Sequence, residues 1–212
     1  MLASHVIFGA YGFWLPNDPR GSWSEYVFSD ALYEFGPATH VRHVSVSGAA
    51  CGTPRSGFAG ETANRSRAHD PHDVNLRLAA KEALQYPPVV FTGIQARAVS
   101  RGFSRFTRET QIPIYACAIM PDHVHLVLGN HERSIKSLVG HLKSFATKQL
   151  NEEGINPMLA VSPAKPRTPW ARGCWKVFLD NEEAVRRAIH YVEQNPVKDG
   201  MRPQKWSFVV PY

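Results

Sequence analysis

Two histidines one residue apart form the pattern in this chain that points most directly to chemistry. His123 and His125 are separated by Val124 within a largely apolar run. On a β-strand, residues i and i+2 point to the same face, so both imidazoles would converge on one point, as two ligands of one divalent cation must. A pair of this kind also occurs as two hydrogen-bonded polar residues on a half-exposed strand. The pair alone leaves both interpretations open.

A tyrosine and an asparagine near the end of the chain have the spacing of neighbours on a helix. Tyr191 and Asn195 are four residues apart, and Arg187 lies one turn earlier on the same face. The amide oxygen of Asn195 suits Mg²⁺ or Mn²⁺. Tyr191 lies beside the apolar stripe of this helix, which allows its phenol to face a cleft. The same placement also fits a border residue whose hydroxyl is in water.

The elements that must position these residues follow from the hydrophobic pattern. Apolar runs over 114–120 and 123–128, separated by Pro121-Asp122, are typical of two antiparallel strands joined by a tight turn. Further strands are predicted from His5 and over 175–179. Helices are predicted over 74–84, from Thr92 to about Thr107, after the capping residue Ser134, and from the capping residue Asn181 to Asn195-Pro196. This order suits an α+β fold, a ferredoxin-like antiparallel sheet with helices on one face.

The composition indicates one ordinary domain with a moderate basic surplus. The 212 residues are 43% hydrophobic, and 24 Lys and Arg against 18 Asp and Glu give a formal net charge of +6. This balance favours nucleic acid as partner over a membrane, because no apolar run has membrane-spanning length. The absence of a signal-peptide pattern and of any CxxC pair among three cysteines suits a cytoplasmic protein.

One stretch departs from this regular pattern. From about 36 to 73 the chain is rich in Gly, Ser, Thr, Arg and His, with few periodic apolar residues. Such composition is typical of an irregular segment. We therefore expect a single domain over 1–212 that carries an irregular insertion at about 36–73.

Two motifs, taken together, resemble a known family. Met120–Leu128 (MPDHVHLVL) and Ala188–Gly200 (AIHYVEQNPVKDG) resemble the paired signatures of the REP-associated tyrosine transposases, in the single-tyrosine branch of the HUH (His-hydrophobic-His) transposases and nucleases. The resemblance covers roughly residues 90 to 200 and the first strand. Asp122 stands where asparagine is common in that motif. The run 13–21 looks like a subset of these proteins, without a role that the sequence assigns.

The resemblance implies particular roles for the candidate residues. His123 and His125 match the metal-binding pair, Asn195 the third metal-ligand position, and Tyr191 the nucleophile. It also implies an HUH nuclease core that binds Mg²⁺ or Mn²⁺. The activity would be cleavage and rejoining of single-stranded DNA at hairpin (REP-like) sequences through a 5′-phosphotyrosine intermediate. The expected partner is single-stranded or hairpin DNA, not a membrane, and the protein would be a monomer or homodimer.

Basic residues are candidates for contacts to DNA phosphates. They lie on the helices predicted around the two motifs and comprise Arg97, Arg101, Arg105, Lys136, Lys143, Arg186, Arg187 and Lys198. Each one also fits a solvated surface charge. Three other functions stay open: a non-catalytic hairpin DNA- or RNA-binding module derived from the family, a replication or plasmid-mobilising nuclease of the same chemistry, and a metal-dependent hydrolase unrelated to DNA.

Overall fold

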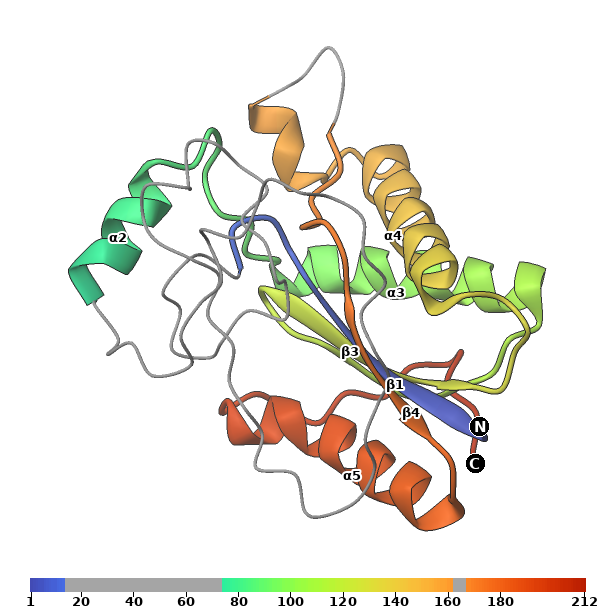
Figure 1. Cartoon of the computed structure of the whole chain (residues 1–212). Helices are drawn as coiled ribbons and strands as arrows, with labels where there is room; N and C mark the ends of the chain where they lie inside the picture. The colour runs from blue at the N-terminus through green and yellow to red at the C-terminus, as the bar shows by residue number, and fades with distance from the viewer. Residues whose placement is uncertain (14–73, 162–166) are drawn as a thin grey trace, which may run out of the picture. The chain divides into compact units, whose positions relative to one another are not determined.

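The computed structural model describes residues 1–13, 74–161 and 167–212 (Figure 1). The chain divides into two compact units, one formed by Met1–Phe13 with Pro88–Tyr212 and the other by Trp14–Pro87. Helix α2 (Val74–Glu82) belongs to the second unit. All residues of the candidate site lie in the first. The predicted insertion at 36–73 falls outside the described residues, so the single-domain organisation stays a prediction.

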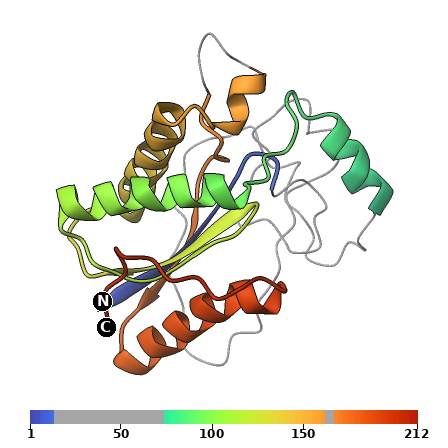
Figure 2. The same cartoon turned by 180° about the vertical axis from the view of Figure 1, so that it is seen from behind.

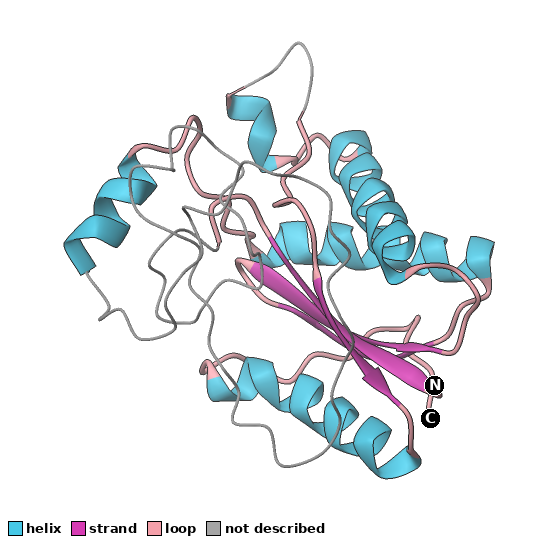
Figure 3. Ribbon diagram, viewed as in Figure 1, coloured by secondary structure: helices cyan, strands magenta, loops and turns pink. Residues whose placement is uncertain are grey.

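A four-stranded antiparallel sheet forms the centre of the first unit. Its strands are β1 (Ala3–Gly9), β2 (Ile114–Ile119), β3 (His123–Gly129) and β4 (Trp175–Leu179), in the order β2-β3-β1-β4 (Figure 3). The predicted hairpin between β2 and β3 is confirmed. Strand β1 is central and pairs with β3 on one side and β4 on the other. Strands from the two ends of the sequence, β1 and β4, are therefore neighbours in the sheet.

Three long helices begin at residues that cap them. Thr92 forms a capping box with Gln95 at the start of α3 (Gly93–Thr110). The side chains of Ser134 and Asn181 cap α4 (Ile135–Glu152) and α5 (Glu182–Lys198) in the same way, as predicted. A short 3₁₀ helix, η2, spans Pro157–Ala160. No helix in the described ranges is both long and apolar enough to cross a membrane.

Helix α5 extends further than expected from its proline. The predicted end at Asn195-Pro196 is wrong, because the helix includes Pro196 and ends at Lys198. A proline removes one backbone donor, here the one that would bond the carbonyl of Val192, and only two helical residues follow it. The N–H of Asp199 still reaches the carbonyl of Asn195 at 3.2 Å. Gly200, with φ of 73°, then turns the chain away.

Helices cover both faces of the sheet (Figures 1 and 2). On one face, Val185, Ala188 and Val192 of α5 pack against residues that include Ala3 and Val127. On the other, α3 and α4 pack on the sheet. The predicted α+β class and antiparallel sheet are confirmed, and the arrangement differs from the expected one in having helices on two faces. The reason is that β1 is buried along its whole length, so both of its faces need cover.

The helices α3 and α4 approach each other closely at one glycine. A Cβ atom on Gly102 would lie 2.7 Å from Cα and 2.8 Å from the backbone nitrogen of Ala146. Real Cβ atoms do not approach backbone atoms that closely. Gly102 is therefore needed for the contact between these helices, in the layer opposite to α5.

Candidate active site

The two imidazoles of β3 converge, as their spacing predicts. The Nε2 atoms of His123 and His125 lie 2.9 Å apart. Both rings are on the sheet face that α5 covers, because alternate residues of β3 point to the same side. Two ligand atoms at about 2.1 Å from one octahedral ion, at right angles, would be about 3.0 Å apart. The spacing of the two nitrogens therefore fits two ligands of a single cation.

The second nitrogen of each imidazole has its own partner. Nδ1 of His123 lies 2.7 Å from a carboxylate oxygen of Asp122, and Nδ1 of His125 lies 3.3 Å from Nε2 of His5. Burial lowers the pKa of His5 to about 4. Burial, with the charges of His123 and His5 as smaller causes, lowers the pKa of His125 to about 2. His5 and His125 are thus neutral near pH 7, and an imidazole must be neutral to bind a metal ion.

Sequence patterning does not identify His5 as part of this site. It lies on β1 opposite Val127, while His125 lies opposite Ile7, so the two histidines are diagonal neighbours on adjacent strands. Only the register between β1 and β3 brings them together. Their separation in sequence hides this contact, and the one available signal is a histidine within a mostly apolar strand.

Tyr191 reaches the imidazoles from α5. Its ring centroid lies 5.7 Å from that of His125 and 5.7 Å from that of His5, and the side chain is 44% exposed. The ammonium of Lys198 lies 5.1 Å from the centroid of the same ring. A solvent-accessible phenol therefore stands beside two buried neutral imidazoles and a cation.

Asn195 follows Tyr191 by one helical turn. Its amide nitrogen donates a hydrogen bond to the backbone carbonyl of Tyr191 at 2.9 Å. This bond uses the amide nitrogen and leaves the amide oxygen, the atom that Mg²⁺ and Mn²⁺ prefer, for another partner. Among the described residues, no three His, Cys, Asp or Glu side chains form a group able to hold a metal ion. The expected ligand set is of another kind, since its third member is an amide.

An aromatic ring covers the outer imidazole. Phe13 stacks on His123 with 4.6 Å between ring centroids and 16° between their planes, and Phe13 is 5% exposed. Gly9, which lies opposite His123 in the sheet, makes room for this ring, because a Cβ there would come within 2.7 Å of Cδ1 of Phe13. The structure thus gives a role to the start of the 13–21 run, which the sequence left unassigned.

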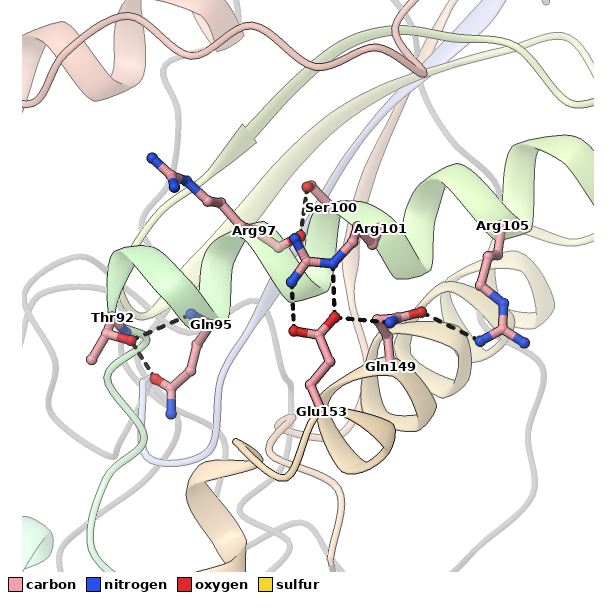
Figure 4. A network of polar contacts seen from close by, with 8 residues as sticks. All are labelled: Thr92, Gln95, Arg97, Ser100, Arg101, Arg105, Gln149 and Glu153. Atoms are coloured by element: carbon pink, nitrogen blue, oxygen red, sulfur yellow. Dashed lines mark hydrogen bonds and ion pairs between the residues drawn. The ribbon is translucent and has the colours of Figure 1, made fainter.

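Of the three α3 arginines proposed as phosphate contacts, two form ion pairs, and the third forms none with the residues that the structure describes. Arg101 forms a two-pronged ion pair with Glu153, and Arg105 pairs with Glu152 at 2.7 Å. Both side chains turn toward α4, whereas the guanidinium of Arg97 points away from it (Figure 4). Two of these candidates therefore join α3 to α4 in this structure, and Arg97 is exposed.

The basic candidates on α4 also differ from each other. The ammonium of Lys143 donates hydrogen bonds to the carbonyls of Ala171 and Gly173, at 2.8 Å and 2.6 Å. Burial lowers its pKa to about 8. Lys136 is exposed. Lys143 thus anchors the segment before β4, whereas Lys136 is accessible.

The basic candidates on α5 show a similar division. Arg186 and Arg187 form ion pairs with Glu182 and Glu183, one turn earlier on the same helix. Both pairs are largely exposed, and such pairs break at little cost. Lys198 instead contacts the ring of Tyr191. Lys198 is thus a predicted phosphate contact that lies next to the phenol of Tyr191.

Comparisons with known proteins address the family of the chain. One similar solved structure is a REP-associated tyrosine transposase bound to a REP hairpin, with 19% identity, a TM-score of 0.42, and coverage of 59% of this chain and 70% of that one. Another is a candidate transposase from Deinococcus radiodurans R1, with 12% identity, a TM-score of 0.34, and coverage of 91% and 89%. No protein with a curated description matches the chain. The family model described as "Transposase IS200 like" matches residues 84–195, more than half of the chain. The chain therefore belongs to the family of IS200-like transposases.

Proposed function

We propose that this transposase is a cytoplasmic, metal-dependent strand transferase that cleaves and rejoins single-stranded DNA with Tyr191 as nucleophile. The observation that carries the proposal is the phenol itself. Tyr191 is 44% exposed, yet its ring lies 5.7 Å from that of His125, which pairs with His123. The preference for hairpin (REP-like) sequences rests on the resemblance of the motifs at 120–128 and 188–200 to REP-associated tyrosine transposases.

The transfer reaction balances without an external energy source. The phenolic oxygen of Tyr191 forms a bond to a backbone phosphorus, and the bond from that phosphorus to the 3′ oxygen breaks. The phenolic proton is lost to solvent, and the departing oxygen takes up a proton to become a 3′-OH. The product is a 5′-phosphotyrosine link. Attack by a 3′-OH on this link reverses the step and rejoins the strand.

Three side chains would hold the metal ion in this proposal. They are His123 and His125 through Nε2, and Asn195 through its amide oxygen. A bound Mg²⁺ or Mn²⁺ would polarise the scissile phosphate and offset the charge that develops during transfer. All three ligands are neutral, so the protein alone should bind the ion weakly. Affinity should rise when a DNA phosphate completes the coordination.

The cations near the phenol would guide the strand. Lys198, over the ring of Tyr191, is suited to contact the phosphate next to the scissile one. Arg97 and Lys136 are exposed and can meet phosphates without losing a partner. Arg101, Arg105 and Lys143 can do so only by leaving the contacts described above. We therefore rank the first three residues above the last three as DNA contacts.

A label-polarity experiment tests the proposal. The protein is incubated with Mn²⁺ and a hairpin oligonucleotide with single-stranded flanks, labelled at either the 5′ or the 3′ end, and then run on a denaturing SDS gel. A 5′-phosphotyrosine predicts that only the 3′ label stays with the protein. Tyr191→Phe should give no adduct, whereas Tyr115→Phe, a partly buried tyrosine on β2, should give one.

The outcomes separate the proposal from its main alternative. An adduct that persists in Tyr191→Phe would show that another residue is the nucleophile. If the protein binds the hairpin tightly but forms no adduct with any oligonucleotide tested, a non-catalytic DNA- or RNA-binding module is favoured instead.

A further inference from the structure

The proposed chemistry does not use His5, a buried histidine on the central strand of the sheet. It is 7% exposed and lies on β1. Its ring stacks on that of His125 with 5.6 Å between centroids and 21° between planes. The edges of Trp175 and Tyr191 also meet it, at 5.4 Å and 5.7 Å. An apolar residue would satisfy these packing contacts, so a histidine here suggests a polar task.

That polar task concerns the second nitrogen of His125. If Nε2 of His125 binds a metal, it presents a lone pair and carries no proton. The neutral ring then has its proton on Nδ1, where it needs an acceptor because the site is buried. Nε2 of His5 lies 3.3 Å from this Nδ1 and can accept that proton. His5 thus faces the nitrogen that decides which tautomer His125 adopts.

The neighbouring histidine has a matching partner of a different kind. The carboxylate of Asp122 only accepts hydrogen bonds, so Nδ1 of His123 donates to it at 2.7 Å. Nε2 of His123 is therefore the nitrogen that faces Nε2 of His125. Partners of this type orient metal-binding histidines and raise their affinity for the ion.

We propose that His5 is a positioning residue: Nε2 of His5 accepts a hydrogen bond from Nδ1 of His125, which keeps the lone pair on Nε2 of His125 available to the metal ion. This inference rests on the proposed metal site.

Mn²⁺ titrations followed by electron paramagnetic resonance test this role, with and without hairpin oligonucleotide. His5→Phe keeps an aromatic ring but no acceptor, and we expect Mn²⁺ affinity to fall about 10- to 100-fold. His5→Gln supplies an amide oxygen and should recover part of this loss. The control is His141→Phe, at an exposed position on α4, which should bind Mn²⁺ as the wild type does.

Nitrogen NMR of the histidine rings reads the tautomers directly. In the wild type with saturating Mg²⁺, the proton of His125 should be on Nδ1, and Nε2 of His5 should carry no proton. A proton on Nε2 of His5 under these conditions, or wild-type Mn²⁺ affinity in His5→Phe, would overturn the role of His5 and leave the proposed function intact. A wild-type protein that binds no Mn²⁺, even with DNA, would overturn both.

Discussion

The two faces of the sheet differ in what they bury, although the same strands build both. Phe8 of β1 points to the α3 and α4 side, where its ring meets that of Phe103. His5, on the same strand, points to the α5 side and meets His125 and Tyr191. One face is thus a hydrocarbon core, and the other combines such a core with a cluster of imidazoles.

This difference separates stability from chemistry. A buried apolar side chain stabilises the fold through the area that it removes from water. A buried imidazole stabilises it little, because its desolvation is offset only by hydrogen bonds. The α5 face keeps Val185, Ala188 and Val192 as an apolar anchor for the helix. Tyr191 can therefore stay half-exposed while its helix is held firmly.

The largest effect is expected on the sheet face that α5 covers, from His123→Ala. Removing one imidazole should lower the rate of adduct formation by about 10³-fold or more, since the proposed metal site loses a ligand. Hairpin binding and the melting temperature should change little, because His123 contributes no apolar core. Gel-based kinetics measure the rate of adduct formation, and a titration measures the affinity for the hairpin. Loss of hairpin binding would mean that the histidine is structural.

On the sheet face that α3 and α4 cover, Phe103→Ala should mainly lower the stability of the protein. Phe103 is fully buried, and its truncation should lower the free energy of unfolding by about 3–5 kcal/mol. Tyr191→Phe, which removes only a hydroxyl from a half-exposed ring, should stay within about 0.5 kcal/mol. Urea unfolding of the two variants tests this contrast. Equal losses of stability would contradict the division between the faces.

Two glycines sharpen the description of the apolar layer. Gly102→Ala should destabilise the protein by about 1–3 kcal/mol, because its Cβ would press on the backbone of Ala146. Gly140→Ala is the matched control on α4, with nothing within 4 Å of the new Cβ, and should stabilise by about 0.5–1 kcal/mol. Thermal unfolding decides the sign of each change. A stabilising Gly102→Ala would show that α3 and α4 do not pack this closely.

The smallest effects concern the arginines of α3. Arg101→Gln should cost at most about 1 kcal/mol of stability through the lost pair with Glu153, and should leave hairpin affinity unchanged. Arg97→Gln should leave stability unchanged, weaken hairpin binding a few-fold and reduce its salt dependence by about one phosphate contact. Fluorescence titrations at several salt concentrations measure both variants. Equal losses of affinity would restore Arg101 as a DNA contact.

Local signals explain why much of the fold could be predicted from the sequence. The hairpin over 114–128 follows from two apolar runs around Pro121-Asp122, and the starts of α4 and α5 follow from their capping residues. The end of α5 was missed because a proline in the last turn is tolerated. The sequence does not predict helices on both faces of the sheet, because the complete burial of β1 depends on where the helices pack.

The candidate site, too, could be predicted from the sequence only in part. His123, His125 and Tyr191 stand out through spacing and resemblance, since these signals are local in sequence. His5 and Phe13 join them only through the register of β1 with β3 and through the room that Gly9 provides. The ion pairs of Arg101 and Arg105 depend on the approach of α3 to α4. Contacts between elements distant in sequence leave no such pattern.

The most direct test of the account is to locate the covalent bond itself. Wild-type protein is incubated with Mn²⁺ and a hairpin oligonucleotide, digested with nuclease and trypsin, and its peptides are measured by mass spectrometry. We predict a nucleotide attached through its 5′ phosphate to Tyr191, absent when EDTA replaces Mn²⁺. A nucleotide on another residue, or the same adduct in EDTA, would contradict the assignment of the polar face as a metal-dependent strand-transfer site.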